Sequence, residues 1–105
     1  MNFLHKVVDE QPMVSVITKI ELLGFNATNS QEQTVTETFI NGALVFELDE
    51  TVTSKTIALR KLYRIKLPDA IIAATAIAYN LTLLTRNTSD FIKIPDLKCV
   101  DPYLL

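Results

Sequence analysis

The chain has very little cysteine, histidine and glycine: its 105 residues include one cysteine, one histidine and two glycines. A single cysteine, Cys99, excludes an internal disulfide and leaves no Cys/His cluster of the kind that binds zinc. Two glycines exclude a glycine-rich phosphate loop. One histidine, His5, gives little support to acid–base catalysis built on histidines. The side chains that remain for chemistry are carboxylates, hydroxyls and amides.

Long apolar runs are also missing. No stretch approaches the roughly 20 residues that a membrane-spanning helix needs, and the N-terminus lacks a signal-peptide core with a cleavage site. Yet 49% of the residues are hydrophobic, which argues against disorder. We therefore predict one domain over residues 1–105 with a modest core, in a protein of the cytoplasm that binds no membrane.

The net charge of −2 conceals an asymmetry. Residues 1–50 carry two basic and eight acidic side chains, whereas residues 51–105 carry eight basic and four acidic ones. A basic face beside a group of carboxylates suits a protein that holds a phosphate backbone. Taken alone, a solvated helix face explains the basic residues at least as well. The basic run, which contains no acid, comprises Lys55, Arg60, Lys61, Arg64 and Lys66.

Apolar periodicity predicts strands that alternate with helices, which is typical of an α/β domain with a mostly parallel sheet. Capping boxes at Thr18–Glu21 and Ser30–Gln33 mark two helix starts. In the helix that begins near residue 50, Ile57, Ala58 and Leu62 are expected to face inward. The predicted helices are 2–10, 18–23, 30–41, about 50–63, 68–79 and a short turn at 90–92; the predicted strands are 13–17, 43–48, 81–85 and 97–101.

Three acidic residues stand where a parallel sheet gathers its ligands, beyond the carboxyl ends of the strands. Glu21 and Asp90 each follow a strand, and Asp69 begins the helix that leads to strand 81–85. Right-handed crossovers would bring all three to one edge, where their mutual repulsion favours a bound cation. Oxygen ligands without histidine suit Mg²⁺ or Mn²⁺, and such a metal can activate water against a phosphate.

Each of these acids also has a purely structural explanation. Glu21 fits the third position of a capping box, Asp69 lies in a helix's first turn where the macrodipole favours negative charge, and Asp90 can cap a turn. Thr18, Thr85 and Asn87 are candidates for hydrogen bonds to the carboxylates or to a metal-bound water. Ordinary turn chemistry accounts equally well for Thr85 and Asn87.

Four segments in this order resemble the PIN domain, especially that of the VapC-type toxin ribonucleases of bacterial toxin–antitoxin pairs. They are Val14 to Gly24, Lys66 to Ala76 with its Leu-Pro-Asp-Ala start, Leu83 to Phe91, and Ile94 to Leu97. The resemblance implies a PIN-like three-layer α/β/α fold with a mostly parallel central sheet. It also implies an Mg²⁺- or Mn²⁺-dependent endoribonuclease in which Glu21, Asp69 and Asp90 are the catalytic and metal-binding acids.

The resemblance extends to partners. It implies RNA, a homodimer, and an antitoxin-like protein that offers a helix to apolar surface near residues 2–8 and 18–25. The candidates for contacts with RNA phosphates are Arg60, Lys61, Arg64 and Arg86.

The chain departs from the PIN pattern at its start. Family members usually open with a strand ending in Asp-Thr-Asn, which has no counterpart before Met1. We therefore expect an N-terminally truncated fold that lacks a central strand and one metal ligand, with a compensating association such as a homodimer or strand exchange. Two alternatives stay open: an inactive PIN-like module that binds RNA or an antitoxin-like protein, and an α/β domain in which the acids are only helix caps.

Overall fold

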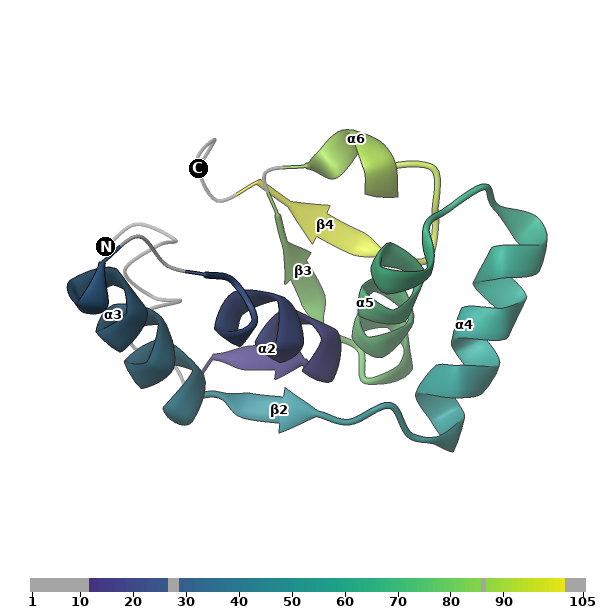
Figure 1. Ribbon diagram of the computed structural model, residues 1–105. Coiled ribbons are helices and arrows are strands. Elements are labelled where there is room, and N and C mark those ends of the chain that lie inside the picture. The colour runs from purple at the N-terminus through teal and green to yellow at the C-terminus, as the bar shows by residue number, and fades with distance from the viewer. Residues whose placement is uncertain (1–11, 27–28, 86, 102–105) are drawn as a thin grey trace.

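The structure is a computed structural model that describes residues 12–26, 29–85 and 87–101. The predicted helix 2–10, His5 and Arg86 lie outside the described residues. Every other predicted element is present, and the α/β class is confirmed (Figure 1). In chain order the elements are β1 (Met13–Ser15), α2 (Val16–Leu23), α3 (Ser30–Asn41), β2 (Leu44–Phe46), α4 (Glu50–Leu62), α5 (Leu67–Ala78), β3 (Thr82–Leu84), α6 (Thr88–Phe91) and β4 (Lys98–Val100).

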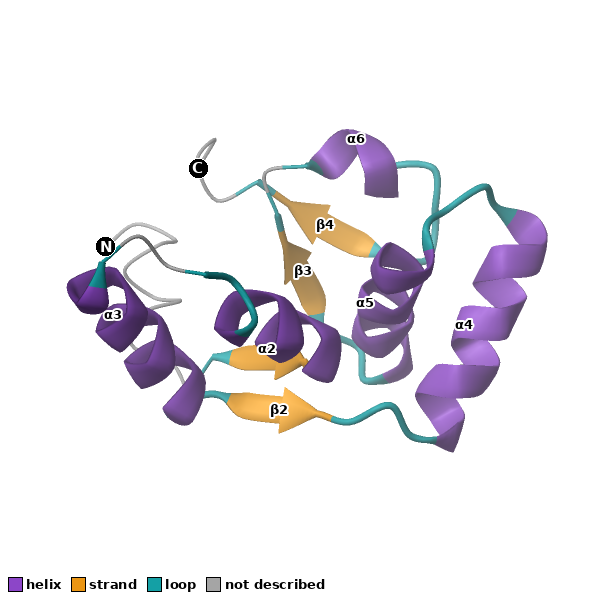
Figure 2. Ribbon diagram, viewed as in Figure 1, coloured by secondary structure: helices purple, strands orange, loops and turns teal. Residues whose placement is uncertain are grey.

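The strands pair in parallel, as predicted, but they form two separate pairs. Strand β1 lies beside β2 with Val14 opposite Val45, and β3 lies beside β4 with Leu83 opposite Cys99. Within the described ranges no ladder of hydrogen bonds joins one pair to the other. Helix α5 contacts both β1 and β3, and Figure 2 shows the two pairs as distinct blocks. Helix α5 therefore packs against both strand pairs.

The core is centred on α5, which is buried along most of its length. The small side chains of Ala70, Ala73 and Ala74 leave almost no exposed surface, which lets neighbouring elements approach closely. Helix α4 makes the most extensive contact with α5. Around these helices the core also contains Phe91, Ile94 and Leu97 from the C-terminal part of the chain.

Helix α2 begins earlier than the sequence predicts. Its N-cap is Ser15, whose Oγ accepts a hydrogen bond from the amide of Ile17 at 3.1 Å. The predicted start at Thr18 is wrong, and so is the capping box, because Thr18 and Glu21 both lie inside the helix. Serine is a stronger N-cap than threonine, and strand β1 is correspondingly short.

Helix α3 is capped by Asn29 rather than by Ser30. The Oδ1 atom of Asn29 accepts a hydrogen bond from the amide of Glu32 at 2.7 Å. The predicted Ser30–Gln33 capping box is therefore wrong, although the helix does end at Asn41 as expected. Asparagine at the preceding position supplies the same acceptor one residue earlier.

The inward face of α4 differs from the predicted one. Ile57 is 53% exposed and Leu62 is 73% exposed, so the inward orientation predicted for Ile57, Ala58 and Leu62 is wrong. The buried residues are Val52, Thr56 and Leu59, spaced as one helical stripe. Thr56 tolerates burial because its hydroxyl donates to the carbonyl of Val52 at 2.7 Å.

A polar contact joins the start of α4 to the end of α5. Asp49 caps α4 by accepting a hydrogen bond from the amide of Val52 at 2.8 Å, and its other carboxylate oxygen accepts one from the hydroxyl of Tyr79. The ring of Tyr79 lies 4.7 Å from that of Phe46, centroid to centroid. The Tyr79 hydrogen bond lowers the pKa of Asp49, and the same bond raises the pKa of Tyr79.

None of the described helices is both long and apolar enough to cross a membrane.

Candidate functional site

A cleft of about 290 Å³ lies at the carboxyl end of β3. It brings together four polar residues that the sequence singles out, Thr18, Asp69, Thr85 and Asn87. They come from α2, α5 and the segment after β3, which are far apart in the sequence. The rest of the cleft is apolar, with side chains from α5, β3 and α6. Its lining residues are Thr18, Asp69, Ile72, Leu83, Leu84, Thr85, Asn87 and Phe91.

The position of Asp69 follows from the start of α5. Pro68 lies in the first turn, where its missing N–H costs nothing, and Asp69 follows it there. Lys66, at the N-cap position, makes no side-chain capping hydrogen bond. The half-buried Asp69 carboxylate is therefore the negative charge at this helix end, where the macrodipole stabilises it.

Asp90 is joined to the cleft through Asn87. The Nδ2 atom of Asn87 donates to Oδ2 of Asp90 at 2.5 Å, and its Oδ1 accepts from the hydroxyl of Ser89 at 3.2 Å. The backbone amide of Asn87 donates to Oγ1 of Thr85 at 3.1 Å. Asp90 lies inside α6 rather than at its cap position, so the interpretation of Asp90 as a helix cap is wrong. Thr85, Asn87 and Asp90 form one hydrogen-bonded unit at the rim of the cleft.

Glu21 is placed differently from the other two acids. It is exposed on α2, three residues and almost one turn beyond Thr18, and it does not line the cleft that the described residues form. No three or more His, Cys, Asp or Glu side chains in the described part of the chain are close enough to hold a metal ion together. The metal-binding roles of Glu21, Asp69 and Asp90 stay predictions.

The donor chemistry of the cleft nevertheless fits a hard divalent cation. Asp69 and Asp90 offer carboxylate oxygens, and Thr18, Thr85 and Asn87 offer hydroxyl and amide oxygens close by. Mg²⁺ takes one or two carboxylates and keeps several waters, so it does not need a preformed cage of three acids.

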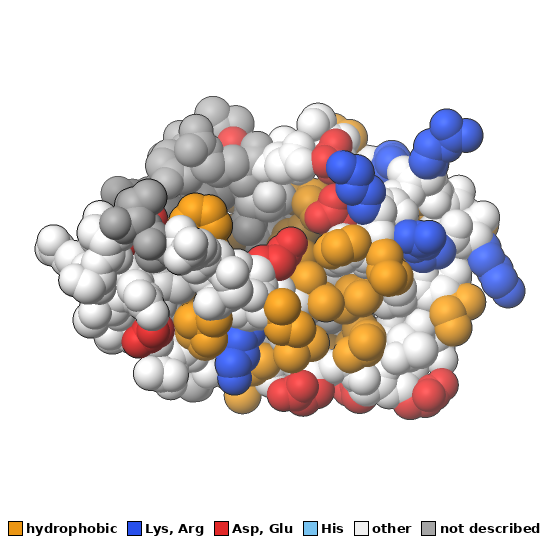
Figure 3. Space-filling model, in the orientation of Figure 1, with side chains coloured by type: hydrophobic (Ala, Val, Ile, Leu, Met, Phe, Trp, Pro, Cys, Tyr) orange, Lys and Arg blue, Asp and Glu red, His pale blue; other side chains and the backbone are white. Residues whose placement is uncertain are grey.

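The basic residues lie on another part of the surface. Arg60 and Lys61 occupy the last turn of α4, where positive charge suits the helix end. Arg60 donates to the carbonyl of Ile65 at 3.3 Å, and Arg64 follows in the turn to α5. Figure 3 shows Lys and Arg side chains gathered on the α4 side of the molecule. None of these three lines the cleft as the described residues define it.

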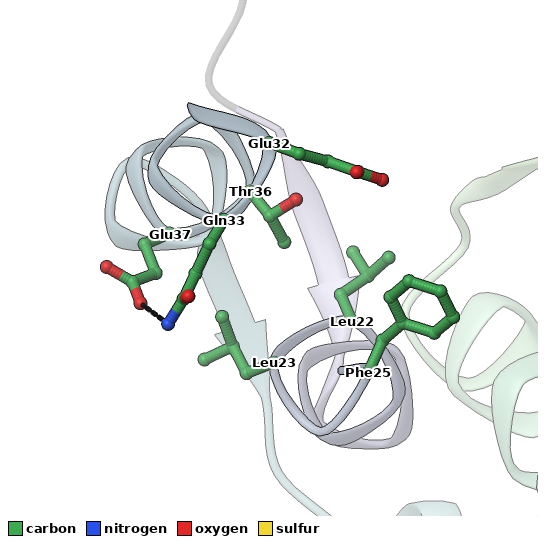
Figure 4. A pocket seen from close by; sticks show the side chains of 7 residues that line it. All are labelled: Leu22, Leu23, Phe25, Glu32, Gln33, Thr36 and Glu37. Atoms are coloured by element: carbon green, nitrogen blue, oxygen red, sulfur yellow. Dashed lines mark hydrogen bonds between the residues drawn. The ribbon is translucent and has the colours of Figure 1, made fainter. Parts of the chain in front are cut away.

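A second, smaller groove separates α2 from α3 (Figure 4). Leu22 and Leu23 project from α2 toward α3, with Phe25 beside them. On the α3 side, Gln33 donates to Glu37 at 3.1 Å. Helix α2 buries none of its own residues, although it is rich in isoleucine and leucine. The α2–α3 groove, lined by Leu22, Leu23, Phe25, Glu32, Gln33, Thr36 and Glu37, overlaps the surface predicted to receive an antitoxin-like helix.

Sequence reasoning missed the apolar wall of the cleft. Ile72 lies one turn after Asp69 on α5, and Phe91 directly follows Asp90. The spacing of three between Asp69 and Ile72 places the two side chains on neighbouring positions of one helix face. That spacing was the signal that could have identified Ile72, whereas the sequence indicates only that Leu83 and Leu84 are buried strand residues.

Comparisons with known proteins agree with this architecture. Residues 2–97 match the PIN domain family. No curated protein matches the chain. Among solved structures, a toxin–antitoxin complex from Klebsiella pneumoniae is 34% identical with a TM-score of 0.75, covering 94% of this chain and 82% of that one.

Two further solved structures are similar. VapBC2 from Rickettsia felis, bound to a DNA fragment from its promoter, is 26% identical with a TM-score of 0.75, covering 92% of this chain and 80% of that one. VapBC-1 from nontypeable Haemophilus influenzae is 25% identical with a TM-score of 0.74, covering 93% of this chain and 82% of that one. The resemblance to PIN domains of the VapC type is confirmed, and the chain belongs to the PIN domain family.

Proposed function

We propose that this chain is an Mg²⁺- or Mn²⁺-dependent endoribonuclease of the VapC toxin type, acting in the cytoplasm. The observation that carries the proposal is the cleft at the end of β3, where a PIN-family chain gathers Thr18, Asp69, Thr85 and Asn87. Asp90 reaches the same place through its hydrogen bond to Asn87. These are oxygen donors at the carboxyl end of a parallel strand, where α/β folds bind their ligands.

The proposed chemistry assigns a role to each residue. Asp69 and Asp90 would hold the cation, which would supply an activated water and stabilise negative charge on the phosphate. Asn87 fixes the Asp90 carboxylate, and Thr85 fixes the backbone of Asn87. Glu21 would join only through a water or a movement of α2, since it stands outside the cleft lining.

The proposed partners are RNA, an antitoxin-like protein and a second copy of the chain. Arg60, Lys61, Arg64 and Arg86 would contact RNA phosphates. An antitoxin-like helix would lie in the α2–α3 groove, whose leucines are exposed; the similar structures from Rickettsia felis and Haemophilus influenzae are VapBC complexes. The homodimer rests on the family resemblance alone.

A second candidate function is an inactive PIN-like module that binds RNA or an antitoxin-like protein. One observation favours it: Glu21 does not join Asp69 and Asp90, and no group of three acids suited to a metal is found among the described residues. The two functions share a fold and differ in whether a metal-dependent cut occurs.

The decisive experiment is cleavage of a structured RNA with Mn²⁺, repeated with EDTA and with the variant Asp69→Asn. Asp96→Asn is the matched control, because Asp96 is exposed and does not line the cleft. We expect cleavage by the parent chain and by Asp96→Asn, and none with EDTA or Asp69→Asn. No cleavage by a folded parent chain, checked by circular dichroism, would favour the inactive module. Equal cleavage by Asp69→Asn would refute the assignment of the site.

A further inference from the structure

The side-chain amide of Asn87 is held at both ends by hydrogen bonds. Its Nδ2 atom donates to Oδ2 of Asp90 at 2.5 Å, and its Oδ1 atom accepts from the hydroxyl of Ser89 at 3.2 Å. The backbone amide of the same residue donates to Oγ1 of Thr85 at 3.1 Å. Because its backbone and both ends of its side chain are engaged, Asn87 has a defined orientation beside the cleft that it lines.

The carboxylate of Asp90 decides which way this amide points. An ionised carboxylate only accepts hydrogen bonds, whereas an amide has a donor end and an acceptor end. A turned amide would place its oxygen against Oδ2 of Asp90, where the two negative partial charges would repel each other. The hydroxyl of Ser89 can donate or accept, so it adapts to either orientation. The NH2 group of Asn87 therefore faces Asp90 whenever that carboxylate is ionised.

This contact makes the two oxygens of Asp90 unequal as ligands for a cation. Oδ2 already accepts a short, charge-assisted hydrogen bond. The positive end of the amide dipole lies beside that oxygen and repels a cation that approaches it. Oδ1 has no such donor from Asn87. Asp90 is thus arranged to bind a cation through Oδ1 alone.

Coordination through one oxygen distinguishes between hard divalent cations. Ca²⁺ takes about six to eight oxygen ligands and often engages both oxygens of a carboxylate. Mg²⁺ needs near-octahedral geometry and usually keeps several waters beside one or two carboxylates. Among the described residues that line the cleft, Asp69 is the one carboxylate. Loss of the second oxygen of Asp90 therefore removes a ligand that Ca²⁺ would use and that Mg²⁺ does not need.

We propose that Asn87 makes the site select Mg²⁺ over Ca²⁺, because it occupies Oδ2 of Asp90 and leaves one oxygen for the cation. The inference rests on the proposed nuclease, in which Asp69 and Asp90 hold the cation. It adds a determinant of metal selectivity that acts through Asp90, so Asn87 is a positioning residue. Ser89 holds the other end of the amide and supports the same orientation.

The test measures binding of cations to the full chain without RNA. Mn²⁺ is the probe, because electron paramagnetic resonance reports the concentration of free Mn²⁺, and Mg²⁺ and Ca²⁺ are titrated as competitors. The quantity compared between variants is the Kd for Ca²⁺ divided by the Kd for Mg²⁺. We expect Asn87→Ala to lower this ratio by about tenfold, at the lower end of the effects that loss of an outer hydrogen-bond partner has on metal affinity. A general loosening of the site would weaken both cations together and leave the ratio unchanged.

Two further variants separate the hydrogen bond from other effects. Asn41→Ala is the matched control, since Asn41 is exposed at the end of α3 and lies outside the cleft lining; its ratio should equal that of the parent chain. Asn87→Leu removes the donor and keeps a side chain of similar size, so it should lower the ratio as Asn87→Ala does. Circular dichroism shows whether each variant is folded, and either Asn87 variant suffices for the comparison with the control.

The outcomes distinguish this inference from the proposed function. An unchanged ratio in the Asn87 variants, with Mn²⁺ still bound, would overturn the inference and leave the nuclease proposal standing. A ratio that falls with Asn87→Ala but not with Asn87→Leu would also overturn it, because bulk rather than the hydrogen bond would then exclude Ca²⁺. A parent chain that binds no Mn²⁺, or binding that Asp69→Asn leaves unchanged, would overturn the proposed site and the inference with it.

Discussion

Replacing Phe91 with alanine tests whether one core residue holds the site's shortest helix in place. Helix α6 has four residues, too few to be stable alone, and Phe91 is its buried residue at 4% exposure. Phenylalanine buries roughly 150–250 Å², which at about 25 cal/mol per Å² corresponds to about 4–6 kcal/mol. Since alanine retains the Cβ atom, we expect Phe91→Ala to lower the free energy of unfolding by about 4 kcal/mol.

Urea unfolding followed by circular dichroism at 25 °C measures this loss. A chain of this size has a total stability of about 5–15 kcal/mol, so the change should be large in any case. The adjacent Ile92→Ala is the matched control, because Ile92 is 79% exposed and should change stability by less than about 0.5 kcal/mol. A loss below about 1 kcal/mol for Phe91→Ala would refute the reasoning, since α6 would then not depend on this contact.

Three further predictions address the polar contact, the basic face and the groove. Tyr79→Phe should lower stability near pH 7. The pKa of Asp49 is lowered in the folded chain, so the stabilisation from the Asp49–Tyr79 hydrogen bond is present above the unfolded pKa of Asp and is lost as pH falls through the folded pKa of Asp49. The pKa of Tyr79 is raised in the folded chain, so the same stabilisation is also lost as pH rises through the folded pKa of the phenol. Thermal melts across pH should show a smaller difference between parent and variant at both extremes than at pH 7; a constant difference would contradict the contact. Lys61→Gln should reduce the salt dependence of RNA binding by about 0.7–0.9 in the log–log slope, measured by fluorescence anisotropy, whereas Lys19→Gln on α2 should not; equal slopes would remove α4 from the RNA surface. Phe25→Glu should abolish binding of an antitoxin-like partner helix in calorimetry without loss of stability, because Phe25 is 65% exposed; unchanged affinity would place that partner elsewhere.

Local sequence signals located the elements but not their first residues. Pro68 marks the start of α5 because proline suits a first turn, and Asn80, with φ of 54°, follows its end as a left-handed residue. At α3 the choice lay between neighbouring cap residues of similar strength, whereas at α2 the stronger cap, serine, lies before the predicted threonine. Ser15 and Asn29 stand one to three residues before the predicted caps, and it is their side chains that accept the capping hydrogen bonds.

The error at α4 has a different origin. A threonine on the buried stripe looks polar in the sequence, so the apolar residues Ile57 and Leu62 seemed to define the inner face. Thr56 is buried because its hydroxyl bonds within the helix, to the carbonyl of Val52. A sequence pattern shows the type of a side chain, not whether its hydrogen bond is satisfied locally.

Part of the candidate site follows from residues that are close in the sequence, and part depends on how distant elements pack together. Thr85, Asn87 and Asp90 lie within six residues of one another, so their hydrogen-bonded unit follows from short-range turn chemistry. Asp69 reaches the same cleft because α5 leads into β3. The position of Glu21 relative to the cleft depends on how the β1–β2 pair is placed relative to the β3–β4 pair. No strand among the described residues connects the two pairs. Whether Glu21 joins Asp69 and Asp90 is therefore a question about how the two strand pairs are arranged rather than about α2 itself.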